Sequence, residues 1–442
     1  MGTVDRPAKM NGALDYDGWE RLEHDLFDGA GEAVQKVREH ARANGAPPVA
    51  FLLAVVQYVL ACMPGNVGFD AGMGRGSMNL FIVLLGLPGA GKDSLMRLVR
   101  NSVLVFDGDT PLKPQPLHLG SGEGIAEALQ PPEGVSTARP VLFGASEVGT
   151  LHTRLTRQGS TLRGTLLDIY SGNSLGMTNK GQIVVIEEGT YTAGLWVAAQ
   201  PDKAHLLMDG EDDGFRHRFV WTELLDPAKL PERPEGTTHL MSVSVPQTVM
   251  AGTPVAFPEQ VKRDVWQQRH LLAAYGVSGS NTGHRTQTQC KVAAGLALLR
   301  SSASVSMDDW RRAGVLMDYS DRVQVFAAGY SQDLEVQREV DRLERKERAQ
   351  EEKQARDERK FEQFQLRALD LVDGVEDGAP PANWTQFLQR LAGRDRPLMK
   401  RAAAVLDEME AVRFFRTDTG GMIVERGPSF HHVLDDMRHR VS

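Results

Sequence analysis

One short segment constrains the fold of this 442-residue chain more than any other, the glycine-rich run Gly86-Leu87-Pro88-Gly89-Ala90-Gly91-Lys92. It follows a nearly continuous apolar stretch, residues 78–85, and precedes a helical pattern from Ser94 to Val99. In such a strand–loop–helix arrangement, successive backbone N–H groups point at phosphate oxygens and the helix dipole adds positive potential. The sequence therefore predicts an ATP-binding loop, with a purely structural glycine turn as the alternative. The residues expected to contact the nucleotide are Gly86, Gly89, Ala90, Gly91, Lys92, Asp93 and Ser94.

Two positions of this predicted site depart from the usual pattern. A Ser or Thr normally follows the lysine and ligates Mg²⁺, whereas here Asp93 follows and Ser94 comes one residue later. The apolar run Val141 to Glu147 offers Glu147 as the base that activates water, but Ser146 stands where a second acid is expected. We hypothesise that hydroxyl and carboxylate have exchanged places, so that Asp93 and Ser146 together hold the Mg²⁺. The alternative is that Asp93 is only a helix N-terminal charge, and that phosphates and water hold the metal.

Further short apolar runs predict the rest of a parallel sheet. They are bounded by turn residues, and helical patterns lie between several of them, which favours a doubly wound α/β fold. The expected strands are Ser102–Phe106, Pro140–Gly144, Gly194–Ala199 and Phe219–Glu223.

Changes in pattern divide the chain into six expected segments. They are a helical N-terminal region (1–75), an α/β core (76–225), an irregular linker with several prolines (226–258), a helical segment (259–330), a charged connecting helix (331–360) and a terminal domain (361–442). The charge run is better explained as a solvated helix than as a nucleic-acid grip, because it has almost no apolar stripe. In the terminal domain three helices, Phe361–Val372, Trp384–Leu391 and Pro397–Glu410, precede a hairpin of Val412–Arg416 and Met422–Arg426. This is the element order of a winged helix.

Composition excludes some classes of protein. With 50 Lys and Arg against 58 Asp and Glu, the net charge of −8 excludes a protein that coats nucleic acid by bulk positive charge, but not one with a few basic loops. Cys62 and Cys290 cannot build a disulfide scaffold, which favours a reducing compartment. Residues 1–10 lack the apolar core of a secretory signal, and the longest apolar stretch, Val49–Met63, is too short to span a bilayer. We therefore expect a cytoplasmic protein without a membrane partner.

Three segments resemble AAA+ ATPases. Leu195–Pro201 is similar to the sensor-1 strand of AAA+ helicases, which implies that Gln200 orients the attacking water. Gly214–Phe219 resembles an arginine-finger segment, which implies that Arg218 reaches the γ-phosphate of a neighbouring subunit. The helical segment from Gly283 to Trp310 resembles a lid of the minichromosome-maintenance type, which implies that Arg285, or alternatively Lys291, is the sensor-2 cation. Equally, either side chain can simply extend along a core helix.

From Trp19 to Arg426 the chain resembles AAA+ replication proteins of phages, plasmids and integrated elements, which are often encoded with primase-polymerase modules. The resemblance implies a P-loop AAA+ core with a parallel sheet, a helical N-terminal part, a helical lid and a C-terminal winged helix. It also implies ATP and Mg²⁺ as cofactors, a homo-hexamer, single-stranded or forked DNA as substrate, and a primase-polymerase partner.

The family resemblance also gives a role to the segment before the sensor-1 strand. Met177–Gln182 carries a turn signature and Ile183–Ile186 is strand-like, so a hairpin with Lys180 at its tip is expected. Ring helicases of this class grip DNA with such a loop, so that one lysine per subunit forms a ring of charge. Arg154, Arg157 and Arg163 are secondary DNA-binding candidates, and the alternative for Lys180 is a solvated turn residue. The winged helix is expected to contact either DNA or protein.

The expected function is a ring-forming AAA+ ATPase that acts as a DNA helicase or translocase in phage or mobile-element replication. The altered magnesium positions keep open an AAA+ initiator or loader that assembles on DNA without unwinding it. A small-molecule kinase is a further alternative, because the loop Gly86–Lys92 also resembles those of nucleotide kinases. Such a kinase has no need of the sensor-1 strand, the lid or the winged helix.

Overall fold

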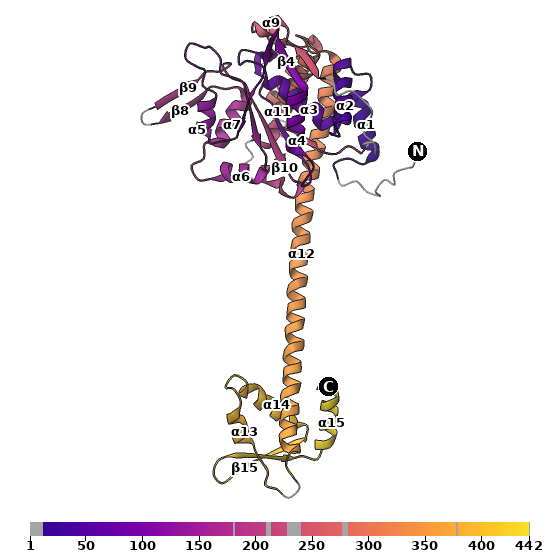
Figure 1. Ribbon diagram of the computed structural model, residues 1–442, viewed down its shortest axis with the longest axis vertical. Helices are drawn as coiled ribbons and strands as arrows, with labels where there is room; N and C mark the ends of the chain where they lie inside the picture. Colours follow the sequence, from indigo (N-terminus) through magenta and orange to yellow (C-terminus); the bar gives the residue numbers. More distant parts are fainter. Residues whose placement is uncertain are drawn as a thin grey trace. The chain divides into compact units, whose positions relative to one another are not determined.

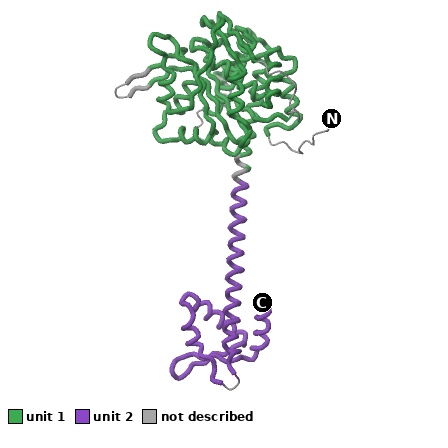
Figure 2. The backbone as a smooth tube through the Cα atoms, viewed as in Figure 1, with its two compact units in different colours: residues 1–334 green, residues 335–442 purple. Residues whose placement is uncertain are grey.

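The computed structural model describes residues 12–179, 182–208, 214–227, 240–275, 282–376 and 379–441. The chain divides into two compact units, residues 1–334 and 335–442, which Figure 2 draws in different colours. Each unit has a hydrophobic core of its own, and the two are described separately.

The first unit is built around a five-stranded sheet in which all strands are parallel. Every residue of its strands β3 and β11 is buried, as expected for strands that are covered on both faces. The predicted α/β class is confirmed. In spatial order the strands are β11 (Phe219–Glu223), β3 (Phe81–Leu85), β10 (Ala193–Ala199), β7 (Val141–Ala145) and β6 (Gln115–His118).

The membership of this sheet differs from the prediction at one strand. The run predicted at Ser102–Phe106 does form a strand, β4 (Val103–Asp107), but β4 lies in a separate sheet between β12 (Met241–Ser244) and β5 (Thr110–Leu112). Its expected place in the central sheet is taken by β6. This strand is polar and contains Pro116, which a sheet tolerates at its edge because an edge strand lacks one set of hydrogen bonds. An apolar run predicts a strand but not the sheet to which the strand belongs.

Helix α3 (Pro48–Ala61) lies in the core of the first unit, and all of its 14 residues are buried. It packs on the central sheet and on α11 (Thr282–Leu299), as Figure 1 shows. Its one polar amide, Gln57, donates to the carbonyl oxygens of Leu80 and Leu195 at 3.0 and 2.7 Å, which ties the helix to β10 and to the residue before β3. Among the described residues no helix is both long enough and apolar enough to cross a membrane.

The predicted helical N-terminal region contains α1 (Tyr16–Phe27) and α2 (Glu32–Ala43) before α3, and then two short strands, β1 (Gly68–Asp70) and β2 (Arg75–Ser77). β1 also pairs with β13 (Val255–Ala256). The other helices of the first unit connect or flank the sheets. They are α4 (Lys92–Ser102), α5 (Gly122–Ala128), α6 (Val148–Thr156), α7 (Leu162–Ser171), α8 (His205–Met208), α9 (Gln247–Met250), α10 (Glu259–Tyr275) and the 3₁₀ turns Pro201–Lys203 and Arg216–Arg218.

The segment expected to be an irregular linker, residues 226–258, is ordered in its described part. Residues 240–258 contain β12, α9 and β13, and both strands pair with strands from the N-terminal third of the chain. The side chains of Val243, Val249 and Val255 are buried in the main core. The spaced valines, rather than the prolines between which they lie, anchor residues 240–258 in the core.

Helix α12 (Met307–Asp373) is one continuous element of 67 residues that begins in the first unit and ends in the second. It joins the end of the predicted lid, the charged connecting segment and the first helix of the terminal domain. Residues 336–360 are all exposed, and their acids and bases pair along the helix, for example Arg348 with Glu344 at 3.4 Å. This part of α12 is a solvated helix, as its charge pattern predicted.

The second unit contains the three predicted helices and the predicted hairpin. After the end of α12 come α13 (Trp384–Arg390) and α14 (Arg396–Glu408), and then the antiparallel pair β15 (Val412–Arg416) and β16 (Met422–Arg426), with β14 (Ala382–Asn383) beside β16. A last helix, α15 (Phe430–Val441), was not predicted. The core of this unit includes Phe364, Trp384, Met399, Leu406, Val424, Phe430 and Leu434.

Candidate functional site

The strand–loop–helix arrangement predicted around the glycine-rich run is present. β3 ends at Leu85, α4 begins at Lys92, and the glycine-rich residues lie between them. Gly89 and Gly91 adopt φ angles of +80° and +83°, a region that favours glycine. A Cβ atom on Gly86 would lie 3.0 Å from the Cβ of Ala90, so the turn is also tight. Because no side chain caps α4, the N–H groups of its first turn are open to an anion.

Lys92 lies across this loop. Its Nζ donates to the carbonyl oxygens of Gly86 and Leu87 at 2.8 and 3.2 Å. Burial lowers the pKa of Lys92, and the neighbouring Asp93 carboxylate opposes that change. Asp93 and Ser94 are exposed in the first turn of α4. The loop therefore presents an ammonium group together with an exposed carboxylate and an exposed hydroxyl.

The strand order brings two other predicted catalytic residues, Gln200 and Glu147, to the same edge of the sheet. β10 pairs with β3 on one side and with β7 on the other, and the N–H of Gly86 donates to the carbonyl of Ala199 at 3.0 Å. Gln200 directly follows β10, and Ser146 and Glu147 directly follow β7. Because the carboxyl ends of parallel strands meet at one edge, Gln200 lies between the loop and Glu147.

Two exposed groups follow β7 at this edge. Ser146 and Glu147 are both exposed, and Glu147 occupies the N-cap position of α6 without making a capping hydrogen bond. Asp93, Ser94, Ser146 and Glu147 offer only oxygen donors, the type that Mg²⁺ prefers. Within the described ranges, no group of three or more His, Cys, Asp or Glu side chains could hold a metal ion alone. This donor set fits a Mg²⁺ that is held mainly by nucleotide phosphates and water, with one or two side chains from the protein.

Arg218 is not part of this edge, and it is not exposed as an arginine finger must be. It immediately precedes β11, so the length of that strand, about 16 Å for five residues, separates it from the loop of its own chain. Its side chain is only 8% exposed, and its guanidinium carbon lies 5.7 Å from the ring centroid of the buried Tyr170. The apolar residues that flank this segment, Phe215 and Phe219, draw it into the core. Arg216, two residues earlier, is exposed.

The two sensor-2 candidates are both engaged elsewhere. Arg285 forms ion pairs with Asp318 and, at 2.8 Å, with Asp321 on α12. Lys291 is fully buried, and its Nζ donates to the carbonyl oxygens of Asn79, at 2.7 Å, and of Tyr170. Burial holds the pKa of Lys291 well below its usual range, and the positive charge of Arg218 is the second cause of this shift. Lys291 is a core residue in this structure, and Arg285 joins α11 to α12.

The predicted DNA-binding hairpin is present, although its tip is not among the described residues. β8 (Leu175–Asn179) and β9 (Gln182–Ile186) pair in antiparallel register and extend from the body of the first unit in Figure 1. Lys180 lies outside the described residues. Arg157 is exposed at the end of α6, whereas Arg154, although exposed, donates a hydrogen bond to the carbonyl of Leu119.

One buried acid beside the loop was not predicted. Glu223 ends β11 in register with Leu85, and the next residue, Leu224, lies against Gly86. The Glu223 carboxylate accepts the N–H of Ala13 at 3.0 and 3.1 Å and contacts the Tyr319 hydroxyl at 3.4 Å. Burial raises its pKa to about 7, although the hydrogen bond from Ala13 acts against this. The available signal was the position of Glu223, at the end of an apolar strand that borders the loop strand.

No protein-family model matches this chain, and no curated protein matches it in sequence. The site is therefore assigned from its geometry and chemistry.

Proposed function

We propose that this chain is a ring-forming AAA+ ATPase that translocates along DNA and unwinds it during phage or mobile-element replication. One observation carries the proposal. β10 is inserted between the strand of the phosphate-binding loop and the strand that ends at Glu147, so that Gln200 follows β10 between them. A polar residue between the loop and a catalytic acid is what the resemblance to sensor-1 segments implies. A structural glycine turn needs no such arrangement.

In the proposed reaction the backbone N–H groups of Gly89 to Lys92 and the ammonium of Lys92 hold the β- and γ-phosphates of ATP. Glu147 accepts a proton from a water that Gln200 orients. The water oxygen bonds to the γ-phosphorus, the bond from that phosphorus to the bridging oxygen breaks, and ADP and phosphate leave. Asp93 and Ser146 would help to hold a Mg²⁺ ion, which would neutralise part of the phosphate charge.

The ring is part of the proposal because the family resemblance implies a homo-hexamer in which a neighbouring subunit supplies the arginine finger. We assign the finger to Arg216 rather than Arg218, because Arg216 is the exposed arginine of this 3₁₀ turn. A neighbouring subunit can bring such a residue to the γ-phosphate, which couples hydrolysis to assembly of a homo-hexamer. The hairpin β8–β9, with Lys180, is the proposed contact with single-stranded or forked DNA.

The second unit supports the proposal through its element order. Helix, helix, helix and hairpin, in α12 to β16, is the order of a winged helix, which binds DNA or a protein such as a primase-polymerase partner. The proposal therefore includes both the helicase activity and the winged helix that the sequence predicted.

The test measures ATP hydrolysis with and without single-stranded DNA, unwinding of a forked duplex, and particle size by electron microscopy with an ATP analogue. Stimulated hydrolysis, unwinding and rings are expected for the wild type. Lys92→Ala and Glu147→Gln should abolish both activities, whereas Glu133→Gln, in an exposed loop, should not.

Three other results would each exclude the helicase. Rings without unwinding would identify an initiator or loader, for which the altered positions Asp93 and Ser146 are the favourable observation. A monomer or dimer that phosphorylates a small acceptor would identify a kinase. No hydrolysis and no nucleotide binding would leave a structural glycine turn.

A further inference from the structure

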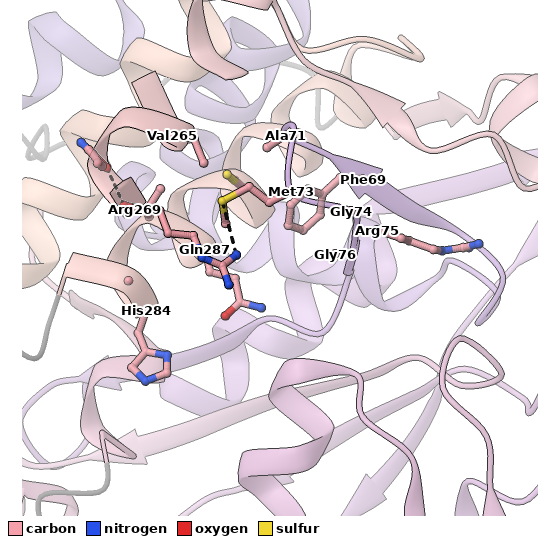
Figure 3. Close-up of a pocket in the computed structure, with 14 residues that line it drawn as sticks. Phe69, Ala71, Met73, Gly74, Arg75, Gly76, Val265, Arg269, His284 and Gln287 are labelled. Atoms are coloured by element: carbon pink, nitrogen blue, oxygen red, sulfur yellow. Dashed lines mark hydrogen bonds between the residues drawn. The ribbon is translucent and has the colours of Figure 1, made fainter. Parts of the chain in front are cut away.

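A cavity of about 510 Å³ lies in the first unit between the β1–β2 hairpin and helices α10 and α11 (Figure 3). It borders residues that lead into β3, at the amino-terminal edge of the central sheet. The phosphate-binding loop lies at the carboxyl edge, and the two sites share no lining residue. A volume of this size is typical of pockets that bind a small molecule or one unit of a polymer.

The charged groups of this pocket are cationic. Arg269 from α10 and Arg75 from β2 line it, and the described lining residues include no Asp or Glu. Figure 3 shows Arg269 beside Met73, whose Sδ lies 3.5 Å from a guanidinium nitrogen, whereas the Arg75 side chain points away from both, so that Arg269 is the arginine that faces the pocket. The first turn of α11, at Gly283 and His284, forms part of the wall, so the positive end of an 18-residue helix lies there. These features favour an anion.

The remaining titratable groups of the pocket add no negative charge. Burial, and then the nearby cations Arg218, His217 and Lys291, lower the pKa of His284. Burial raises the pKa of the Cys290 thiol to about 12, so that this group is neutral at physiological pH.

The rest of the lining fits a flat ring. Phe69, Val265 and Met73 supply an apolar surface, and Gln268 and Gln287 supply amides that can bond the edge of a base. The Phe69 ring is held in place by close packing, because a Cβ on Gly76 would come within 2.2 Å of it. The Arg269 guanidinium can stack on a planar ring as well as bond a phosphate.

We propose that this pocket binds one nucleotide unit, with its phosphate at Arg269 and the first turn of α11 and its base against Phe69 and Met73. A single strand of DNA and a free nucleotide both present this chemistry. The DNA alternative deepens the proposed function and rests on it, because it gives the translocated strand a contact away from the β8–β9 hairpin.

The test uses the full-length Lys92→Ala protein, so that the phosphate-binding loop does not compete. Fluorescence anisotropy follows the binding of fluorescein-labelled oligo(dT) and, separately, of a fluorescent ADP analogue at several KCl concentrations. Arg269→Ala is compared with Arg263→Ala, an exposed arginine of the same helix that bonds Gln260 at 3.0 Å and does not line the pocket. Circular dichroism checks that both variants fold.

Arg269→Ala is expected to weaken binding about tenfold and to make the slope of log affinity against log salt shallower by about 0.7 for the strand. Met73→Glu, at an exposed turn, should weaken binding by charge repulsion, and Arg263→Ala should change it less than twofold. If Arg269→Ala weakens the binding of oligo(dT) alone, the pocket is assigned to DNA. If it weakens the binding of the ADP analogue alone, the pocket is assigned to free nucleotide. Equal binding of both ligands by Arg269→Ala and Arg263→Ala would overturn the proposal. A wild type without ATPase activity would refute the proposed function and leave this result unaffected.

Discussion

Glu223 should make the stability of the first unit depend on pH near neutrality. Its carboxylate is 2% exposed, and its pKa is raised to about 7 from 4.5. Because the folded state binds the proton more tightly than the unfolded state, the stabilisation is complete below about pH 4.5 and is lost as the pH rises through about 7. The linkage relation gives a loss of about 2.5 kcal/mol between pH 5 and pH 8.

Glu223→Gln removes this titration and keeps an oxygen that can accept the N–H of Ala13. We therefore expect wild type and variant to differ in free energy of unfolding by an amount that changes by about 2.5 kcal/mol between pH 5 and pH 8. Every other group titrates equally in both proteins, so the difference isolates Glu223. Urea unfolding followed by tryptophan fluorescence is suitable, because all tryptophans except Trp384 lie in the first unit. Parallel pH profiles for the two proteins would refute the reasoning.

Four further substitutions test the core and the assignment of the arginines. Lys291→Met should lower the free energy of unfolding by about 2 kcal/mol, because two buried carbonyl oxygens lose their donor; an unchanged urea midpoint would contradict this. Gly144→Ala should cost about 1–3 kcal/mol, since the new Cβ would come within 2.7 Å of the Trp196 ring, and a melting temperature equal to wild type would argue against that contact. Arg216→Ala should slow ATP hydrolysis about 100-fold or more without a change in melting temperature, whereas Arg218→Ala should lower the melting temperature. Phosphate release and thermal unfolding measure both effects, and the opposite pattern would return the finger to Arg218.

Features that depend on local sequence were predictable. The loop predicted to bind phosphate depends only on a buried strand, a glycine turn and a helix within about 20 residues, and this local arrangement is present in the structure. The strands β3, β7, β10 and β11 were visible as apolar runs because both faces of each are covered. The hairpin of β15 and β16 was visible from its turn residues.

Features that depend on long-range packing were not predictable with the same rules. β6 is a polar edge strand, and no run of residues distinguishes β4 from a strand of the central sheet. Arg218 and Lys291 were interpreted as candidate site residues because the segments around them resemble AAA+ motifs, whereas both side chains are buried. Lys291 is the one charged residue in an apolar stretch that ends at Leu299. Helix α15 did carry a signal, since Phe430, Val433, Leu434 and Met437 follow helical spacing and are all buried.

The burial of α3 has a consequence for the way this chain is made. One of its two main helical partners, α2, precedes it in the chain, whereas the other, α11, begins roughly 220 positions after α3 ends. At ordinary ribosomal speeds, on the order of 10 to 40 s pass between the emergence of α3 and that of α11. During that time α3 can pack on α2 and α4, but the face that α11 covers has no partner, and the central sheet that also covers α3 is completed only when β11 has emerged. We expect nascent chains stalled before residue 282 to bind chaperones more strongly than full-length chains do. The chaperone-binding segment should map to residues 48–61.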